Sequence, residues 1–278
     1  MKATVRQACF AGSFYPGNAR QLQADVTAML DAAAVPADTP RPQGIIAPHA
    51  GYMYSGECAA TAYARVRTFA ASYRTVVIVA PSHRARFDFS SVFDGDGYET
   101  PLGVVPVARE LVEKLRGKSG VEISGAGHVE GAMAEHSLEV QLPFLQAALG
   151  EFQLLPIVMG YQTPAITARL SDALAEIIDP ESTLLVASSD LSHFHSAGTA
   201  AKLDGRVIAA VQAFDPQALM GLIDSGKAEA CGFCPITAVM MTCWKLGART
   251  ARAIEYRHSG QVTGDNEEVV GYLAAEVY

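Results

Sequence analysis

Short apolar runs alternate along this chain with longer segments whose apolar residues recur at helical spacing. The short runs are rich in β-branched residues, as in buried strands, and cover 44–47, 75–80, 152–160 and 183–189. Helical spacing predicts helices over 19–34, 57–69, 107–116, 135–149, 164–178, 197–214, 216–224 and 236–246. Further strands are predicted within 91–107, 251–259 and 269–278. The alternation predicts one α/β domain over residues 1–278, with a mostly parallel or mixed central sheet flanked by helices.

Three of the apolar runs lead into histidine. "IIAPH" ends at His49, "VIVAPSH" at His83 and "LLVASSDLSH" at His193. In open α/β sheets, ligands bind in the crevice outside the carboxyl ends of the strands. Histidine is the commonest side-chain metal ligand and the usual acid or base near neutral pH. A single histidine at a strand end is more often structural, but three in equivalent positions favour one shared site.

The type of metal depends on which donors join these histidines. Three neutral imidazoles suit zinc, whereas two imidazoles with an anionic ligand and open positions suit non-haem Fe(II). The candidate anionic ligands are Asp190, Glu135, Glu139 and a cysteine thiolate.

The thiolate candidate lies in "EACGFCPIT", where Cys231 and Cys234 have C-x-x-C spacing. A second C-x-x-C, which a four-thiolate zinc site needs, is absent from the sequence, and the segment does not follow the start of a βαβ unit. A dithiol redox centre is therefore disfavoured. A cysteine at the start of the helix expected here would have its thiolate favoured by the helix N-terminus.

Other polar and aromatic residues are candidates for the walls of such a site. His136 and Glu139 are three residues apart and share a helix face. Tyr54, with Tyr52 and Phe194, would supply aromatic surface to a small planar ligand. The remaining histidines, His128 and His258, are expected to be structural or exposed, and the remaining cysteines to be buried packing residues.

Composition narrows the class of partner. The net charge is −8 and the pI is near 5.4, with no basic cluster, so nucleic acid and anionic membrane surfaces are not expected partners. No apolar run approaches the roughly 20 residues of a membrane span. The first residues lack the apolar core of a secretory signal, and five irregularly spaced cysteines do not indicate a disulfide framework. A cytoplasmic protein with reduced thiols is expected.

Seven motifs, in order, carry a family resemblance. They are "AGSFYPG", "APHAGYMYSG", "APSH", "EHSLEVQLPFL", "SSDLSH", "CGFCPI" and "SGQVTGDNEEVVGYLA". Their order and spacing resemble the Memo family, which includes the AmmeMemoRadiSam system protein B. The resemblance covers essentially the whole chain.

The resemblance implies a fold similar to that of class III extradiol dioxygenases and a site that binds Fe(II), with copper as an alternative metal. It implies that His49 and His83 are ligands, that Asp190 and His193 contribute to the site wall, and that Cys231 stands where the dioxygenases have their carboxylate. Two positions differ from the family pattern. Arg84 replaces a frequent second histidine after "PSH", and His195 is additional.

The expected protein is an iron-dependent oxidoreductase of unknown substrate. Its expected metal ligands are His49, His83, His193 and Cys231, with His193 as acid or base and Asp190 orienting it. Two rivals remain: a non-catalytic module that binds an anionic or phosphorylated peptide, and a zinc hydrolase. Small molecules, anionic peptides and products of the AmmeMemoRadiSam system are the partners considered. The residues expected to line the substrate pocket are Tyr54, His136, Arg84 and His195.

Overall fold

The computed structural model describes residues 4–35, 40–128 and 134–278. The strands are β1 (Val5–Arg6), β2 (Gly44–Ala47), β3 (Thr75–Pro81), β4 (Ser90–Val92), β5 (Gly97–Thr100), β6 (Gly103–Pro106), β7 (Val121–Ile123), β8 (Gln153–Met159), β9 (Thr183–Ser188), β10 (Asp190–His195), β11 (Ala251–His258) and β12 (Val269–Val277). The helices are α1 (Ala19–Ala32), α2 (Tyr52–Arg67), α3 (Arg109–Leu115), α4 (His136–Glu139), α5 (Leu142–Leu149), α6 (Pro164–Ile177), α7 (Ala197–Gln212), α8 (Pro216–Asp224), α9 (Phe233–Lys245) and α10 (Gly260–Thr263), with a 3-10 turn η1 (Ala70–Ser72).

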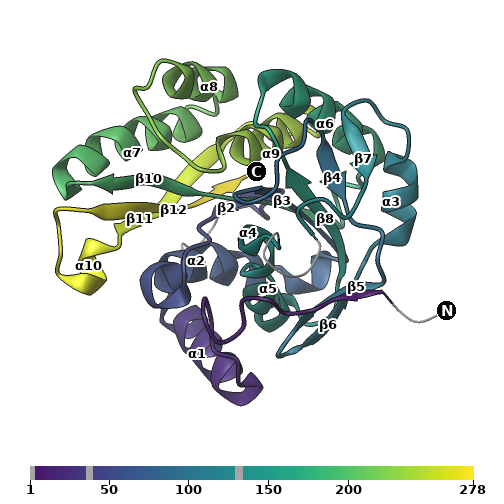
Figure 1. Ribbon diagram of the computed structural model, residues 1–278, viewed down its shortest axis with the longest axis horizontal. Helices are drawn as coiled ribbons and strands as arrows, with labels where there is room; N and C mark the ends of the chain where they lie inside the picture. The colour runs from purple at the N-terminus through teal and green to yellow at the C-terminus, as the bar shows by residue number, and fades with distance from the viewer. Residues whose placement is uncertain (1–3, 36–39, 129–133) are drawn as a thin grey trace.

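A nine-stranded mixed sheet runs through the molecule (Figure 1). Its strand order is β10-β12-β2-β9-β3-β8-β4-β7, and β11 pairs with β12 as an additional edge strand. The four central strands β2, β9, β3 and β8 are mutually parallel, whereas β12 is antiparallel to β2, β10 and β11. The central strands are almost wholly buried, as their uninterrupted apolar sequences require. The predicted α/β class with a mixed central sheet is confirmed.

Helices cover the sheet in two groups (Figure 1). Helix α9 packs against β2, β9 and β3 and is flanked by α6 and α8. Helices α2 and α4 pack against the strands from the other group, with α1 and α5 outside α2. Among the helices that the structure describes, none is long and apolar enough to cross a membrane.

The parallel arrangement brings the predicted strand ends together. Strand β9 lies between β2 and β3, with Ala47 opposite Ser188 and Val79 opposite Ala187. The carboxyl ends of the three strands therefore meet at one edge of the sheet, where the loop with His49 and the loop with His83 begin.

Three predicted elements differ in the structure. Helix α2 begins at Tyr52, five residues before the predicted start, because the buried face of the helix already includes Tyr52 and Ser55. The amphipathic segment 135–149 is divided into α4 and α5, with Pro143 in the first turn of α5. The third difference is an element that was not predicted: a new strand, β10, starts at Asp190 and pairs with β12 at the far side of β2.

The N-terminal segment is anchored to helix α4 by a buried ion pair. Arg6 of β1 is hydrogen-bonded to Glu139 of α4, and both side chains are buried. Glu139 also accepts hydrogen bonds from Tyr15 Oη at 2.5 Å and from the backbone N–H of Phe10 at 2.9 Å. Glu139, considered above as a metal ligand, is thus engaged in holding residues 6–15 against α4.

Candidate metal centre

His49 follows β2 and is held through both its backbone and its ring. Its backbone N–H donates to Oδ1 of Asp190 at 2.7 Å, and its Nδ1 lies 2.9 Å from Oγ of Ser188 at the end of β9. The side chain is buried. Burial, reinforced by the neighbouring histidines His136 and His83, holds the pKa of His49 well below its ordinary value. The ring is therefore neutral at pH 7, the state in which imidazole binds metals.

One carboxylate positions the other two imidazoles. Oε1 of Glu135 lies 3.0 Å from Nδ1 of His83 and 2.9 Å from Nδ1 of His136. The contact with His83 is a well-directed hydrogen bond, whereas the contact with His136 is a close approach outside hydrogen-bond geometry. Glu135 also caps α4, since its Oε1 accepts from the backbone N–H groups of His136 and Ser137.

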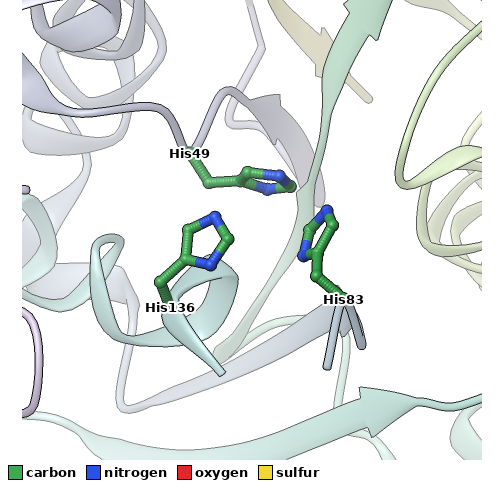
Figure 2. Close-up of side chains that lie close together, drawn as sticks. All are labelled: His49, His83 and His136. Atoms are coloured by element: carbon green, nitrogen blue, oxygen red, sulfur yellow. The ribbon is translucent and has the colours of Figure 1, made fainter. Parts of the chain in front are cut away.

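His49, His83 and His136 form a compact group (Figure 2). One potential ligand atom from each ring lies within 4.8 Å of those of the other two. The ring centroids are 5.2 Å apart for His49 and His83, 5.3 Å for His49 and His136, and 4.9 Å for His83 and His136. Exposure increases across the group from buried His49 through His136 to His83, so the cluster opens to solvent beside His83.

The group differs from the predicted ligand set in its third member, and it contains neither His193 nor Cys231. His136, predicted to line the substrate pocket, is its third member, whereas His193 is not part of it. The reason is the unexpected strand β10, which carries His193 to a position opposite Val270 of β12. His193 remains close enough to act electrostatically on His49 and on Asp190.

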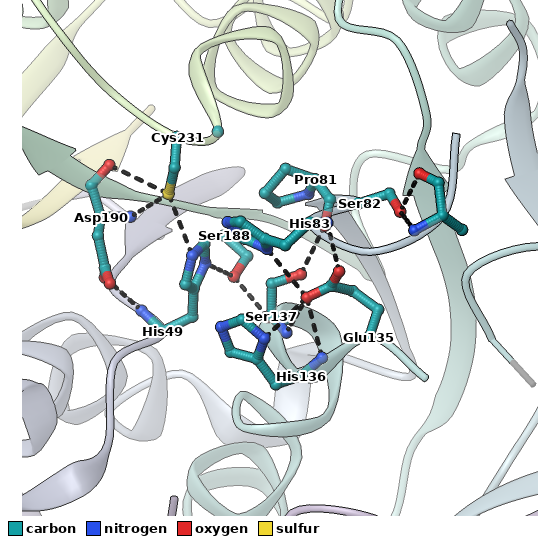
Figure 3. A network of polar contacts seen from close by, with 12 residues as sticks. His49, Pro81, Ser82, His83, Glu135, His136, Ser137, Ser188, Asp190 and Cys231 are labelled. Carbon is teal, nitrogen blue, oxygen red and sulfur yellow. Dashed lines mark hydrogen bonds and ion pairs between the residues drawn. The ribbon is translucent and has the colours of Figure 1, made fainter. Parts of the chain in front are cut away.

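Cys231 lies on the opposite side of His49 from Ser188 (Figure 3). Its Sγ is 3.1 Å from Nε2 of His49 and accepts from the backbone N–H of Asp190 at 3.2 Å. Helix α9 begins at Phe233, two residues later. The expectation of a favoured thiolate is wrong for the metal-free chain, because burial, with the negative charge of Asp190, raises the pKa of the Cys231 thiol. Cys231 and Cys234 are both free thiols.

The carboxylate of Asp190 is hydrogen-bonded to backbone N–H groups. Its Oδ1 accepts from the N–H groups of His49 and Ala50, at 2.7 and 3.3 Å. Burial raises its pKa, against the lowering effect of these bonds. The carboxylate was expected to orient His193, but the bonds it makes shape the turn that presents His49.

The other residues predicted to line the pocket make contacts outside this group. Tyr54 is in the first turn of α2 and is partly buried. The guanidinium of Arg84 stacks over the ring of Phe10, at 5.5 Å from its centroid. Nε2 of His195 lies 2.9 Å from Oε2 of Glu229. Phe194, between His193 and His195, is 71% exposed and has a positive φ of 59°.

Two aromatic residues were missed by the sequence analysis. His136 packs against Phe14, with ring centroids 4.6 Å apart, and against Phe10, at 5.6 Å. These rings form a wall beside the imidazoles because Glu139 holds their segment against α4. The available signal was the motif "AGSFYPG", which contains Phe14.

The remaining histidines and cysteines have the expected structural roles, with one exception. His128 is buried, and His258 lies on the edge strand β11. Cys58, Cys234 and Cys243 are buried, but Cys9 is partly exposed, because its segment lies on the outside of α4.

Comparison with known proteins agrees with the motifs. A family model described as "Memo-like protein" matches residues 6–276. A MEMO1 family protein of Methanosarcina mazei is 36% identical over 276 residues, covering 97% of this chain and 98% of that protein. A MEMO1 family protein of Aquifex aeolicus is 34% identical over 270 residues, covering 97% of each.

Among solved structures, the uncharacterized protein JW3007 from Escherichia coli K12 has a similar fold, with a TM-score of 0.52. It is 14% identical and covers 84% of this chain and 99% of its own length. This likeness shows that the two chains share an α/β fold.

Proposed function

Because this chain belongs to the Memo-like protein family, we propose that its histidine cluster binds one transition-metal ion, Fe(II), and serves an oxidoreductase reaction on a small anionic substrate. The observation that carries the proposal is the convergence of His49, His83 and His136 within 4.8 Å. Each ring has its Nδ1 beside an oxygen of Ser188 or Glu135, which leaves Nε2 as the ligand atom.

The donor set fits such a metal. Metal-bound histidines commonly direct their second ring nitrogen to a carboxylate or another oxygen, which fixes the ring and raises its basicity. Imidazole suits iron, zinc and copper. His49 and His83, which the sequence predicted as ligands, both belong to the compact group, and this supports their assignment as two of the donors. We assign the third donor to His136 because it belongs to the compact group. Two residues compete for this position: Cys231, whose Sγ lies beside Nε2 of His49, and His193.

Bound Fe(II) would supply a redox centre with open positions for substrate and O₂. The chain's own residues would bind and orient the substrate around it. Phe10 and Phe14 form an aromatic wall against His136. The guanidinium of Arg84 stacks over Phe10 and adds a positive charge to this wall, which suits a substrate with a carboxylate or phosphate. His193 is the proposed acid or base, accepting a substrate proton at its imidazole.

Metal analysis of protein purified without oxygen tests this proposal. We expect one metal ion per chain after reconstitution with Fe(II). We expect none in His49→Ala or His83→Ala, with an unchanged circular dichroism spectrum. His258→Ala, on the edge strand β11, is the matched control and should keep full metal content. Failure of the wild-type protein to bind metal, or full binding by either ligand variant, would contradict the assigned site.

The third donor can be identified by the same measurement. His136→Ala, His193→Ala and Cys231→Ser each remove one candidate. We expect His136→Ala to weaken Fe(II) binding most, because His136 shares the compact group. An equal or larger loss in Cys231→Ser would assign the third position to the thiol instead.

A zinc hydrolase is the second candidate, and one observation favours it. The compact group contains three imidazoles and no carboxylate, which is the donor set of a catalytic zinc site with one open position. Oxygen uptake separates the two functions, because the iron protein should consume O₂ in the presence of a reducing substrate and the zinc protein should not. Zinc retained at one ion per chain through purification without added metal, with no O₂ uptake, would favour hydrolysis.

A further inference from the structure

We propose that Ser188 is a positioning residue that holds His49 with its hydrogen on Nδ1, and so directs the lone pair of Nε2 into the metal site. This inference rests on the proposed metal-binding function, but the position of the hydrogen can be measured without any metal. In the neutral ring of histidine, one nitrogen donates and the other accepts, and the partners of the ring decide which.

The first step concerns Gln141, which lies next to Ser188. The Nε2 of Gln141 is 3.0 Å from the carbonyl oxygen of Pro48 and 2.8 Å from Oγ of Ser188. A carbonyl only accepts, so the amide group beside Pro48 must be the N–H₂ end. Its Oε1 then accepts from Oη of Tyr63 at 2.6 Å. The orientation of Gln141 is fixed, and its amide donates to Ser188.

The second step concerns the hydroxyl hydrogen of Ser188. Oγ of Ser188 donates to the carbonyl oxygen of Ser137 at 2.6 Å (Figure 3). Ser137 lies in the four-residue helix α4, whose carbonyls need partners from outside so short a helix. A hydroxyl has one hydrogen and two acceptor positions. With the hydrogen given to Ser137 and one acceptor position taken by Gln141, Ser188 can only accept from Nδ1 of His49.

The consequence falls on the opposite side of the ring. With the hydrogen on Nδ1, Nε2 of His49 carries the lone pair. In the metal-free protein this lone pair accepts the hydrogen of the Cys231 thiol, whose Sγ is 3.1 Å away. The neutral hydroxyl of Ser188 thus orients the ring of His49 for metal binding, whereas the carboxylate of Glu135 has this role for His83 and His136.

Nitrogen NMR of histidine-labelled, metal-free protein at pH 8 tests the assignment. The His49 signals are identified by their loss in His49→Gln. We expect the protonated-nitrogen signal on Nδ1 and the lone-pair signal on Nε2. The reverse pattern in the wild-type protein would overturn the proposal directly, whether or not any variant folds.

Two substitutions, each of which removes one buried hydroxyl group, complete the test. Ser188→Ala leaves Nδ1 without its acceptor, so the hydrogen should move toward Nε2, where Sγ of Cys231 can accept it. Zn²⁺ affinity, measured by competition with a chelating dye, should fall about 10- to 100-fold, as for other orienting partners of metal ligands. Tyr63→Phe also loses one buried hydroxyl but leaves Gln141 anchored by Pro48, so it should keep both the wild-type signals and the wild-type affinity.

The outcomes separate the two proposals. Unchanged His49 signals and unchanged Zn²⁺ affinity in a folded Ser188→Ala protein would overturn the role of Ser188. A wild-type protein that shows the Nδ1 hydrogen but binds no Zn²⁺ would confirm the assignment of the hydrogen and contradict the proposed metal-binding function.

Discussion

At the residue scale, the carboxylate of Glu135 accepts several hydrogen bonds at once. Its Oε1 accepts from Nδ1 of His83 and from the backbone N–H groups of His136 and Ser137, and its Oε2 accepts from the N–H of His83. Burial alone would raise its pKa, but contacts with His136 and His83 outweigh burial and lower the pKa. A single ionised carboxylate therefore caps α4 and orients two imidazoles.

The substitution Glu135→Gln tests this role. The amide keeps one acceptor oxygen, but its N–H₂ end must then face an N–H donor of His83 or of α4. We expect metal affinity to fall about 10- to 100-fold, measured by Zn²⁺ competition. Glu113→Gln, which alters an exposed pair with Arg116 on α3, is the control and should leave affinity unchanged. Equal affinities in the two variants would show that Glu135 does not orient the ligands.

At the element scale, the segment that carries Cys231 packs directly on the end of β9. A Cβ added to Gly232 would lie 2.3 Å from the carbonyl oxygen of Ser188 and 2.8 Å from Cβ of Ser189. The backbone N–H of Gly232 donates to Oγ of Ser189 at 2.9 Å, and Cys231 N–H donates to the carbonyl of Asp190 at 3.1 Å. The glycine after Cys231 is therefore needed because two backbones approach closely.

We expect Gly232→Ala to displace this segment and to separate Cys231 from His49. Thiol labelling of the metal-free protein should become faster at Cys231, and the free energy of unfolding should fall by about 1–3 kcal/mol, the usual cost of overpacking. Gly205→Ala is the matched control. Its Cβ would meet nothing within 4 Å, and on helix α7 it should stabilise by about 0.5–1 kcal/mol. Wild-type labelling in Gly232→Ala would argue against the close approach.

At the scale of the whole molecule, His128 joins the large sheet to a second, three-stranded sheet with the strand order β1-β5-β6. Its Nε2 donates to the carbonyl oxygen of Ser91 in β4 of the large sheet, at 3.0 Å, and its Nδ1 accepts from the hydroxyl of Tyr98 in β5 of the small sheet. Burial lowers the pKa of His128 to about 4, with a smaller contribution from Arg6, against the raising effect of the bond to Ser91.

This histidine should make the fold sensitive to acid. The unfolded chain binds a proton on the ring near pH 6.5, whereas the folded chain binds it only near pH 4. Stability from the neutral ring is therefore present above pH 6.5 and is lost as pH falls toward 4, by up to about 3 kcal/mol. Urea unfolding at pH 7 and pH 4 should show a smaller pH effect in His128→Gln than in the wild-type protein. Identical pH effects would contradict a buried, neutral His128.

The α/β class and most of its elements could be predicted from the amino-acid pattern alone. Continuous apolar runs such as Thr75–Pro81 can be stable only inside a covered sheet. Helix α8 begins at Pro216, as predicted, directly after Asp215, whose side chain caps the helix. The amino-acid pattern also placed His49 and His83 at one edge of the sheet, since parallel strands end on the same side. These features follow from local hydrophobicity and from strand direction, both of which are encoded in short segments.

The side chains that complete the site could not be predicted in this way, because they are brought together by packing between distant elements. His136 joins His49 and His83 because α4 is docked beside β3 and β8, while the pairing of β10 with β12 takes His193 out of the compact group. Likewise, Glu135, Ser188 and Gln141 look like ordinary polar residues in the sequence. Their contacts with His49, His83, Pro48 and one another join residues 47 to 139 positions apart, and such contacts depend on how helices and strands pack rather than on any local pattern.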